Sequence, residues 1–312
     1  MEYPNPKIKY YKVRTFNEKM NTAFDFLREN WKSLLKFSFY LILPICLLQS
    51  FSMNAAMKHY FNLGFNLGSG GTDFDIFSVL LNYAIYMVFI LLGTSLLNAL
   101  VYTLMIEYER RDSRLAVISV QDIKRSLIKN SVKILRVYLL LIGFFLLIGA
   151  LVVGLAMLSP WTLILTVLIF LIVMVVFMIP LNLIMPIYIF EDISFSTAFR
   201  KSFKYGFSGW GQTFLILLVF GLLANIVSGV TTMPWYLVML FGQIFSITEQ
   251  GAGINAAIWY QFIMYLLGII QSYGTYVSLI ISAVGIAFQY FHLREKNEGI
   301  SVYTNIQNFD RL

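Results

Sequence analysis

The sequence has little charge, and its charges are unevenly spread. Only 12% of its 312 residues are Asp, Glu, Lys or Arg, about half of the roughly 25% that is usual in soluble domains. Residues 137–190, 205–248 and 250–291 contain none at all. A bilayer-spanning helix needs roughly 20 apolar residues, so the first run is long enough to cross a membrane twice, with a break at residues 159–161. These absences argue against a soluble protein and predict an integral membrane protein.

Cysteine and histidine are almost absent as well. Cys46 is the single cysteine, so an internal disulfide is excluded, and we interpret its thiol as inert packing in an apolar segment. His59 and His292 are the two histidines, and the topology inferred below places them on opposite sides of the membrane. That argues against a His-rich metal site, because zinc ligands lie within about 2.0–2.2 Å of one ion. The P-loop, nucleophile-elbow and dinucleotide motifs are also missing, so we expect no cofactor, no metal and no enzymatic activity.

Six apolar segments predict an all-α, polytopic membrane helix bundle. The expected spans are residues 34–51, 76–106, 134–158, 161–190, 212–233 and 258–291. Pro180 and Pro186 permit a kink in the fourth span. We expect residues 1–312 to form a single integral membrane domain, because no polar stretch is long enough for a separate folded domain of the usual size. Residues 1–33 would be its cytoplasmic amphipathic N-terminal segment, and residues 292–312 its cytoplasmic tail.

The basic residues predict the orientation. All of the 23 Lys and Arg residues except Lys36 and Lys58 lie in the N-terminal segment or in the segments after spans two, four and six. Cytoplasmic loops are enriched in Lys and Arg, so both termini are expected in the cytoplasm. The same residues predict membrane lipids with anionic headgroups as partners, and other membrane proteins are left open as partners. We expect no nucleic-acid binding, because the basic residues are divided among four segments and interleaved with acids.

Large apolar residues recur at helical spacing in the segments before spans one, three and five. The stripes are Phe16, Met20, Phe24, Leu27 and Trp31; Val120, Ile123 and Leu127; and Phe195, Phe199, Phe203 and Phe207. Basic residues flank each stripe, a pattern typical of helices that lie in the membrane interface. We therefore expect cytoplasmic interfacial amphipathic helices, and the three stripes suggest a threefold repeat of such a helix followed by a helical hairpin.

Two segments are expected outside the membrane. Met53 to Asp75 is predicted to be a loop, with a turn at its glycine-rich tip, residues 68–71. Residues 235–247, which follow Pro234, are apolar but too short to span a bilayer. They are predicted to form an interfacial or re-entrant helix, and the sequence leaves these two alternatives open.

Uncharged polar residues within the spans are candidates for a binding site. The amides concerned are Asn98, Asn182, Asn225 and Gln271. Buried amides need hydrogen-bond partners, and we favour bonds between helices, worth about 0.6 kcal/mol each. The alternative is a continuous polar cavity or lipid pocket.

An acidic pair, Glu191 and Asp192, ends the fourth span. Asp192 or Ser194 is expected to cap the following helix, because helix N-termini favour such side chains. Glu191 is the candidate for a latch, a salt bridge to Arg200 or Arg294 that would join the cytoplasmic ends of the bundle. Ligand binding by the two acids is the third interpretation.

Several short motifs support a family resemblance. Residues 185–194 combine an apolar segment that contains Pro with an acidic pair and a small residue. A basic residue followed by Ser occurs within residues 198–202, and a span begins with Trp at residues 209–210. The start of the first span at residues 30–31, together with Pro44, and the end of the last span at residues 291–299 complete the set. In these motifs nearly the whole chain resembles a family of uncharacterised bacterial membrane proteins, related to the noncatalytic membrane domain of some glycerophosphodiester phosphodiesterases. The resemblance implies six helices in the bacterial cytoplasmic (inner) membrane and no established activity.

Three classes of function follow from these expectations. A noncatalytic integral membrane scaffold or subunit of a membrane complex is favoured, because the spans lack catalytic groups and carry no charge except near their ends, at Lys36 and Arg136. A transporter or lipid-handling protein would need a continuous polar cavity lined by the four amides. An intramembrane enzyme would need Asp73, Asp75 and Glu249 to converge on the outside.

Overall fold

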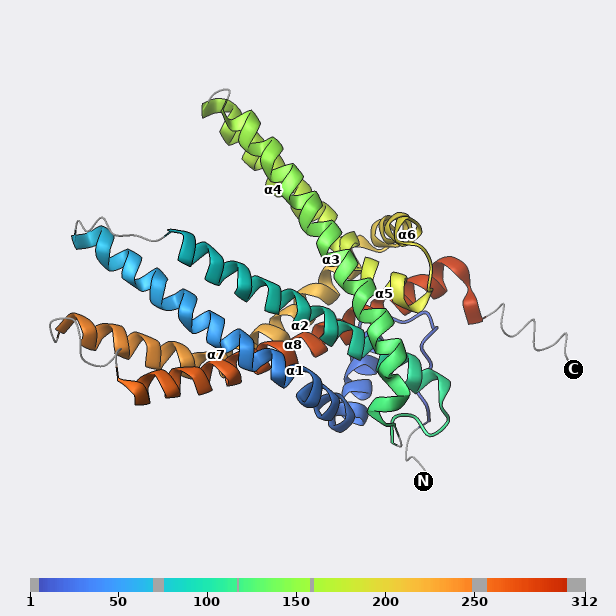
Figure 1. The fold of residues 1–312 in the computed structure, drawn as a ribbon. Helices are drawn as coiled ribbons and strands as arrows, with labels where there is room; N and C mark the ends of the chain where they lie inside the picture. Colours follow the sequence, from blue (N-terminus) through green and yellow to red (C-terminus); the bar gives the residue numbers. More distant parts are fainter. Residues whose placement is uncertain (1–5, 70–75, 117, 158–159, 249–256, 302–312) are drawn as a thin grey trace, which may run out of the picture. The chain divides into compact units, whose positions relative to one another are not determined.

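A computed structural model describes residues 6–69, 76–116, 118–157, 160–248 and 257–301. This part of the chain forms helices and their connections, with no strand (Figure 1). The helices are α1 (Phe16–Ser69), α2 (Ile76–Arg110), α3 (Val120–Ala156), α4 (Pro160–Leu181), α5 (Ile184–Phe190), α6 (Phe195–Ser208), α7 (Trp210–Thr248) and α8 (Ile258–Glu298). Within the described residues, six helices are long and apolar enough to cross a membrane. The predicted all-α, multi-pass membrane architecture is therefore confirmed.

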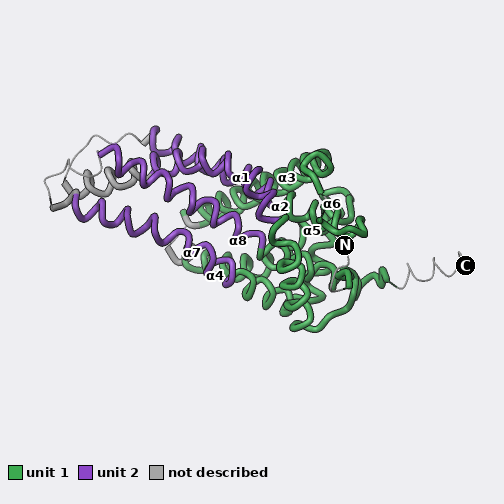
Figure 2. Tube along the Cα trace, turned by 90° about the horizontal axis from the view of Figure 1, so that it is seen from below, with its two compact units in different colours: residues 1–33, 98–221, 281–312 green, residues 34–97, 222–280 purple. Residues whose placement is uncertain are grey.

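The chain divides into two compact units (Figure 2). Unit 1 comprises residues 1–33, 98–221 and 281–312, and unit 2 comprises residues 34–97 and 222–280. Helices α1, α2, α7 and α8 each contribute one part to unit 1 and another part to unit 2.

Aromatic rings form the core of unit 1. Tyr10 stacks on Phe291 with ring centroids 4.6 Å apart, and Phe26 of α1 meets Tyr108 of α2 edge to face at 5.2 Å. Phe288 of α8 packs edge to face on Tyr10 at 5.6 Å. Such ring pairs contribute about 0.5–1.5 kcal/mol each beyond the area that they bury. They join the N-terminal segment to α1, α2 and α8.

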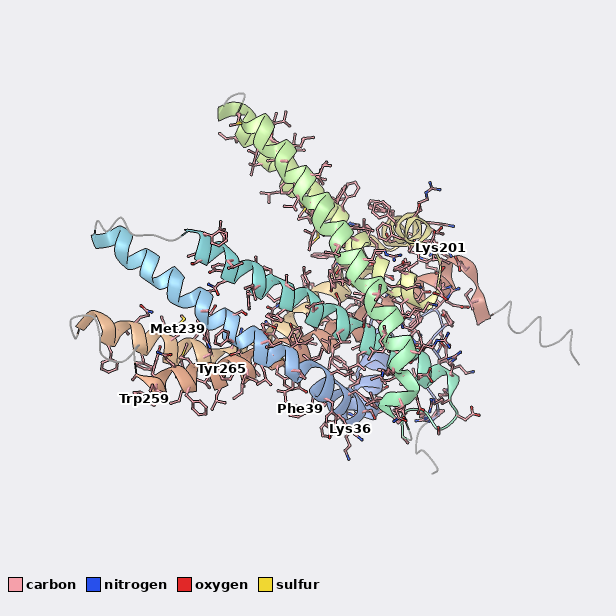
Figure 3. The ribbon with its side chains drawn as sticks, viewed as in Figure 1. Lys36, Phe39, Lys201, Met239, Trp259 and Tyr265 are labelled. Carbon is pink, nitrogen blue, oxygen red and sulfur yellow. The ribbon has the colours of Figure 1, made fainter. Side chains whose placement is uncertain are left out.

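Unit 2 has a core of its own where α1, α7 and α8 meet. Met53, Trp235, Met239, Tyr260 and Met264 form one buried cluster (Met239 is labelled in Figure 3). Methionine suits such a site because its flexible thioether fills irregular gaps between rings.

A close approach of α2 and α8 also belongs to unit 2. A Cβ atom at Gly93 would lie 2.1 Å from the Tyr276 hydroxyl, so only glycine leaves room for this ring. The hydroxyl donates a hydrogen bond to Gln49 Oε1 at 2.6 Å. The glycine thus permits a buried contact among α1, α2 and α8.

The structure corrects the expected loop at residues 53–75. Helix α1 continues to Ser69, and residues 70–75 lie outside the described part. Residues 53–58 contain Met, Ala and Lys, which are good helix formers, and no proline. Met53 and Ala56 are also buried, so packing favours continuation of the helix.

Residues 235–247 do not form the separate helix that was expected, and their position relative to the membrane stays a prediction. Helix α7 runs without interruption from Trp210 to Thr248, with Pro234 inside it. Proline removes one backbone donor and strains the preceding turn, yet Trp235 is buried and its Nε1 donates to Asn54 Oδ1 at 3.3 Å. Packing after the proline therefore holds the helix together, and the apolar run continues the helix that contains the expected fifth span.

The stripe predicted in residues 16–31 lies on a helix, but it is not the packed face. Phe24 is 40% and Trp31 51% exposed, whereas Ala23, Phe26 and Asn30 are buried. Residues 16–33 belong to the same helix as the first span, and of the three striped segments only α6 is separate from the span that follows it. Their location at a membrane interface stays a prediction.

Candidate functional site

The candidate site begins where the fourth span breaks. Helix α4 ends at Leu181 and α5 begins at Ile184. Pro186 has no N–H to bond the carbonyl of Asn182, and the Asn182 Nδ2 atom donates to the carbonyl of Met178 at 2.7 Å. The chain then passes through the seven residues of α5 to the acidic pair at residues 191–192.

Ser194, and not Asp192, caps α6. The Ser194 side chain accepts a hydrogen bond from the Thr197 N–H at 3.3 Å. Asp192 has a φ of +50°, in the left-handed region that Asp enters more readily than most residues. Its carboxylate accepts from Lys129 at 2.8 Å and also from Lys133, both on α3. These two hydrogen bonds lower the pKa of Asp192.

The Glu191 carboxylate is the centre of a network of charges. It is 3% exposed, and its Oε2 accepts from Lys201 Nζ of α6 at 2.6 Å (Figure 3). Its Oε1 accepts from the Tyr290 hydroxyl at 3.2 Å and lies 3.6 Å from Arg294 Nε. Glu298 completes the network, because it accepts from Lys201 at 2.8 Å and from Arg294 at 3.2 Å. Two acids and two bases therefore alternate, and join the end of α5 to α6 and α8.

Burial and ion pairing shift the pKa of Lys201 in opposite directions. Burial lowers the pKa of Lys201, but its hydrogen bonds to Glu191 and Glu298 outweigh burial and raise it. Burial, and then the hydrogen bond to Glu298, raise the pKa of the Tyr205 hydroxyl. All four carboxylate oxygens of Glu191 and Glu298 have a partner. The arrangement neutralises charge and positions helices.

This network contains only part of the predicted latch. Arg294 lies within it, while Arg200 is exposed on α6 and Lys201 makes the contact considered for it. Lys201, Tyr290 and Glu298 were not predicted as site residues from the sequence. The spacing of Tyr290, Arg294 and Glu298, four residues apart on one helix face, is the signal that could have found the α8 side.

A second polar cluster surrounds Lys19 near the start of α1. Lys19 is 1% exposed, and its ammonium group donates to Gln289 Oε1 at 2.8 Å and to Gln212 Oε1 at 3.2 Å. Gln289 Nε2 in turn donates to Thr213 Oγ1 at 2.9 Å. Within the described ranges, no carboxylate forms an ion pair with Lys19. A buried cation is thus held by two neutral amides.

The neighbouring His292 is buried too. Its Nδ1 accepts from the Arg14 N–H at 3.0 Å, so the neutral ring carries its proton on Nε2. Nε2 has no hydrogen-bond partner among the residues that the structure describes. Sequence reasoning had placed His292 in the cytoplasmic tail rather than in a buried part of α8.

The four amides singled out from the sequence lie in different places. In unit 1, Asn98 donates to the Tyr138 hydroxyl at 3.2 Å, and Asn182 bonds its own helix. In unit 2, Asn225 lies on an exposed part of α7, and the buried Gln271 Oε1 has no partner in the described part of the chain. A continuous cavity lined by all four stays a prediction.

Within the described ranges of the chain, no group of three His, Cys, Asp or Glu side chains could hold a metal ion. Asp73, Asp75 and Glu249 lie outside the described residues. Comparisons of the chain with protein-family models, with curated proteins and with solved structures found no match.

Proposed function

We propose that this chain is a noncatalytic integral membrane scaffold or a subunit of a membrane complex. The observation that supports the proposal is the network of Glu191, Lys201, Arg294 and Glu298. Its carboxylates bond to cations and hydroxyls of their own chain, so they are engaged in holding helices together. A general acid or base must lie within hydrogen-bond reach of the substrate proton that it transfers, whereas all four of these carboxylate oxygens are occupied by groups of the same chain.

The proposed setting is the cytoplasmic membrane of a bacterium, with both termini in the cytoplasm. The orientation is inferred from the distribution of Lys and Arg. The choice of the bacterial cytoplasmic membrane is inferred from the family resemblance of residues 185–194. In this setting the basic residues of α6 would face anionic lipid headgroups, and partner membrane proteins would contact the apolar helix surfaces.

Capture of the chain in native membranes tests the proposal. The tagged protein would be extracted with surrounding lipid, and the proteins that accompany it would be quantified against an unrelated six-span protein expressed at the same level. We expect at least one membrane protein to be enriched in fixed proportion to the chain. Recovery of the chain alone, from membranes cross-linked before extraction, would overturn the proposal.

A second candidate is a transporter or lipid-handling protein with a polar intramembrane cavity. One observation in unit 2 favours it: Gln271 Oε1, Ser95 Oγ and Ser272 Oγ are buried without a partner among the described residues. Buried polar groups are usually bonded to protein or to water. A solute or a water chain would supply these partners.

Cysteine accessibility tests the cavity, and the single cysteine makes the background simple. Cys46 is buried, and Cys46→Ala would be the starting variant. A cysteine at Ser95 or Ser272 should react with a small membrane-impermeant thiol reagent if a cavity admits water. The matched control is Ser278→Cys, because Ser278 is equally buried but donates to the carbonyl of Thr275 at 2.7 Å. If the thiol reagent reacts with none of the three introduced cysteines, the transporter or lipid-handling function is excluded.

A further inference from the structure

An apolar groove lies between α3, α4 and α6, within unit 1. Its volume is about 440 Å³. Every residue along it is apolar, including Phe145 and Ile148 of α3, Met174 and Phe177 of α4, and Phe199 and Phe203 of α6. The groove offers no polar side chain to a ligand.

The groove is elongated and has one fixed end. On α4 its lining extends from Phe170 to Leu181, which corresponds to about 16 Å at the rise of an α-helix. At one end α6 packs tightly on α4, because a Cβ atom at Gly206 would lie 2.7 Å from Pro180 Cα. The Phe177 ring also contacts Phe203, with centroids 5.6 Å apart. The shape suits a linear apolar chain that ends at α6.

Two cations stand beside this end. Arg200 and Lys204 directly follow the lining residues Phe199 and Phe203, and both are exposed. On a helix with about 100° between residues, Arg200 lies about 60° from Phe203 around the axis. Neither forms an ion pair in the part of the chain that the structure describes, whereas Lys201 turns toward Glu191 and Glu298. Arg200 therefore lies beside the apolar groove, and Lys204 lies one turn further along α6, about 100° from Phe203 around the axis. Both are cations without an ion pair among the described residues.

From this juxtaposition we propose a binding site for an anionic phospholipid. One acyl chain occupies the groove, and Arg200 and Lys204 hold the headgroup phosphate. Arg is suited to this role because its guanidinium binds phosphate oxygens in a bidentate manner. An extended peptide fits less well, since its backbone would find no hydrogen-bond partner against a wholly apolar lining. The site rests on the proposed contact of the basic residues of α6 with lipid headgroups and adds the groove that holds the acyl chain, but it does not require a protein partner.

Lipid binding by the purified protein tests the site. The full chain in detergent would receive phosphatidylglycerol or phosphatidylcholine of identical acyl chains, and bound lipid would be counted by native mass spectrometry. We expect a preference for phosphatidylglycerol in the wild type. In the double variant Arg200→Gln and Lys204→Gln the two lipids should bind about equally.

A charge-matched control separates this site from general electrostatics. Lys124 and Arg125 are exposed on α3 and lie away from the groove lining, so Lys124→Gln with Arg125→Gln should retain the preference. If both double variants lose it equally, or if neither does, the proposed headgroup site is wrong.

Substitutions that fill the groove with a larger side chain test whether an acyl chain binds there. Met174→Trp should reduce the binding of both lipids, and Ile148→Trp provides the same test from α3 if the first variant does not fold. Unchanged binding of phosphatidylcholine in a folded, groove-filled variant would overturn the proposal. These measurements use the chain alone, so they are independent of any failure to find a protein partner.

Discussion

The carboxylate of Glu191 accepts a hydrogen bond from the ammonium group of Lys201 at 2.6 Å. These residues lie on either side of the turn between α5 and α6, and Glu191 is almost fully buried. The same ammonium group reaches Glu298 at the end of α8. A single lysine therefore connects two carboxylates from distant parts of the sequence.

Removing the charge of Glu191 should destabilise unit 1. In Glu191→Gln the Lys201 and Arg294 cations lose a buried partner, and we expect a cost of about 1–3 kcal/mol. Thermal unfolding of the purified variant provides the measurement. Arg200→Gln is the control, and it should stay within about 0.5 kcal/mol because Arg200 is exposed. Equal effects of the two variants would show that the network contributes nothing.

The cap of α6 should depend on Ser194 and not on Asp192. Ser194→Ala removes the acceptor for the Thr197 N–H and should cost about 0.5–2 kcal/mol. Asp192→Gly removes two ion pairs, with Lys129 and Lys133, of about 0–1 kcal/mol each, but glycine suits the positive φ at this position. The unfolding temperatures of both variants decide the matter. If Asp192→Gly lost more stability than Ser194→Ala, Asp192 and not Ser194 would be the more important residue at the start of α6.

The contribution of Asp192 should depend on pH. Hydrogen bonds from Lys129 and Lys133 lower its pKa in the folded protein, so folding favours the charged carboxylate. The resulting stability is present above the unfolded pKa of about 3.9 and is lost as the pH falls through the lower folded value. Asp192→Asn should therefore be less stable than wild type at pH 7, and this difference should shrink in acid. If unfolding measurements gave the same difference in stability between Asp192→Asn and wild type at pH 7 and in acid, that result would contradict the ion pairs.

Lys19 and Gln289 should behave as a pair. Lys19→Met leaves Gln289 Oε1 buried without its donor, and we expect a cost of about 1–3 kcal/mol. Lys19→Met combined with Gln289→Leu removes both polar groups, and apolar replacements of buried charged groups are often neutral or stabilising. The double variant should then unfold at a higher temperature than Lys19→Met alone. Additive losses would show that the two residues are not coupled.

The predicted orientation can be tested in intact cells with Cys46→Ala as the background. A cysteine at Ser69 should react with an impermeant thiol reagent from outside, because it ends α1 opposite to the predicted cytoplasmic N-terminus. A cysteine at Ser301 should react only after the cells are opened. The reverse pattern would exclude the proposed topology, while labelling of both positions in intact cells would call for a different number of crossings.

Several features of the fold were predictable from the sequence alone. The six spans follow from long runs without charge, because transfer of a charged side chain into hydrocarbon is costly wherever the chain crosses. The break before Pro160 was predictable for a local reason, since proline is favoured at the first position of a helix and α4 begins there. The helical stripe of residues 195–207 likewise predicted α6.

Only the tertiary structure decided where α1 and α7 end and which base pairs with Glu191. Helix α7 passes Pro234 because Trp235 packs in unit 2 and bonds Asn54, a residue far away in the sequence. Lys201 meets Glu191 because the buried face of α6, with Ala198, Ser202 and Tyr205, sets the rotation of the helix. Hydropathy and spacing report how each segment interacts with its solvent, whereas helix ends and ion pairs depend on neighbours that the fold brings together.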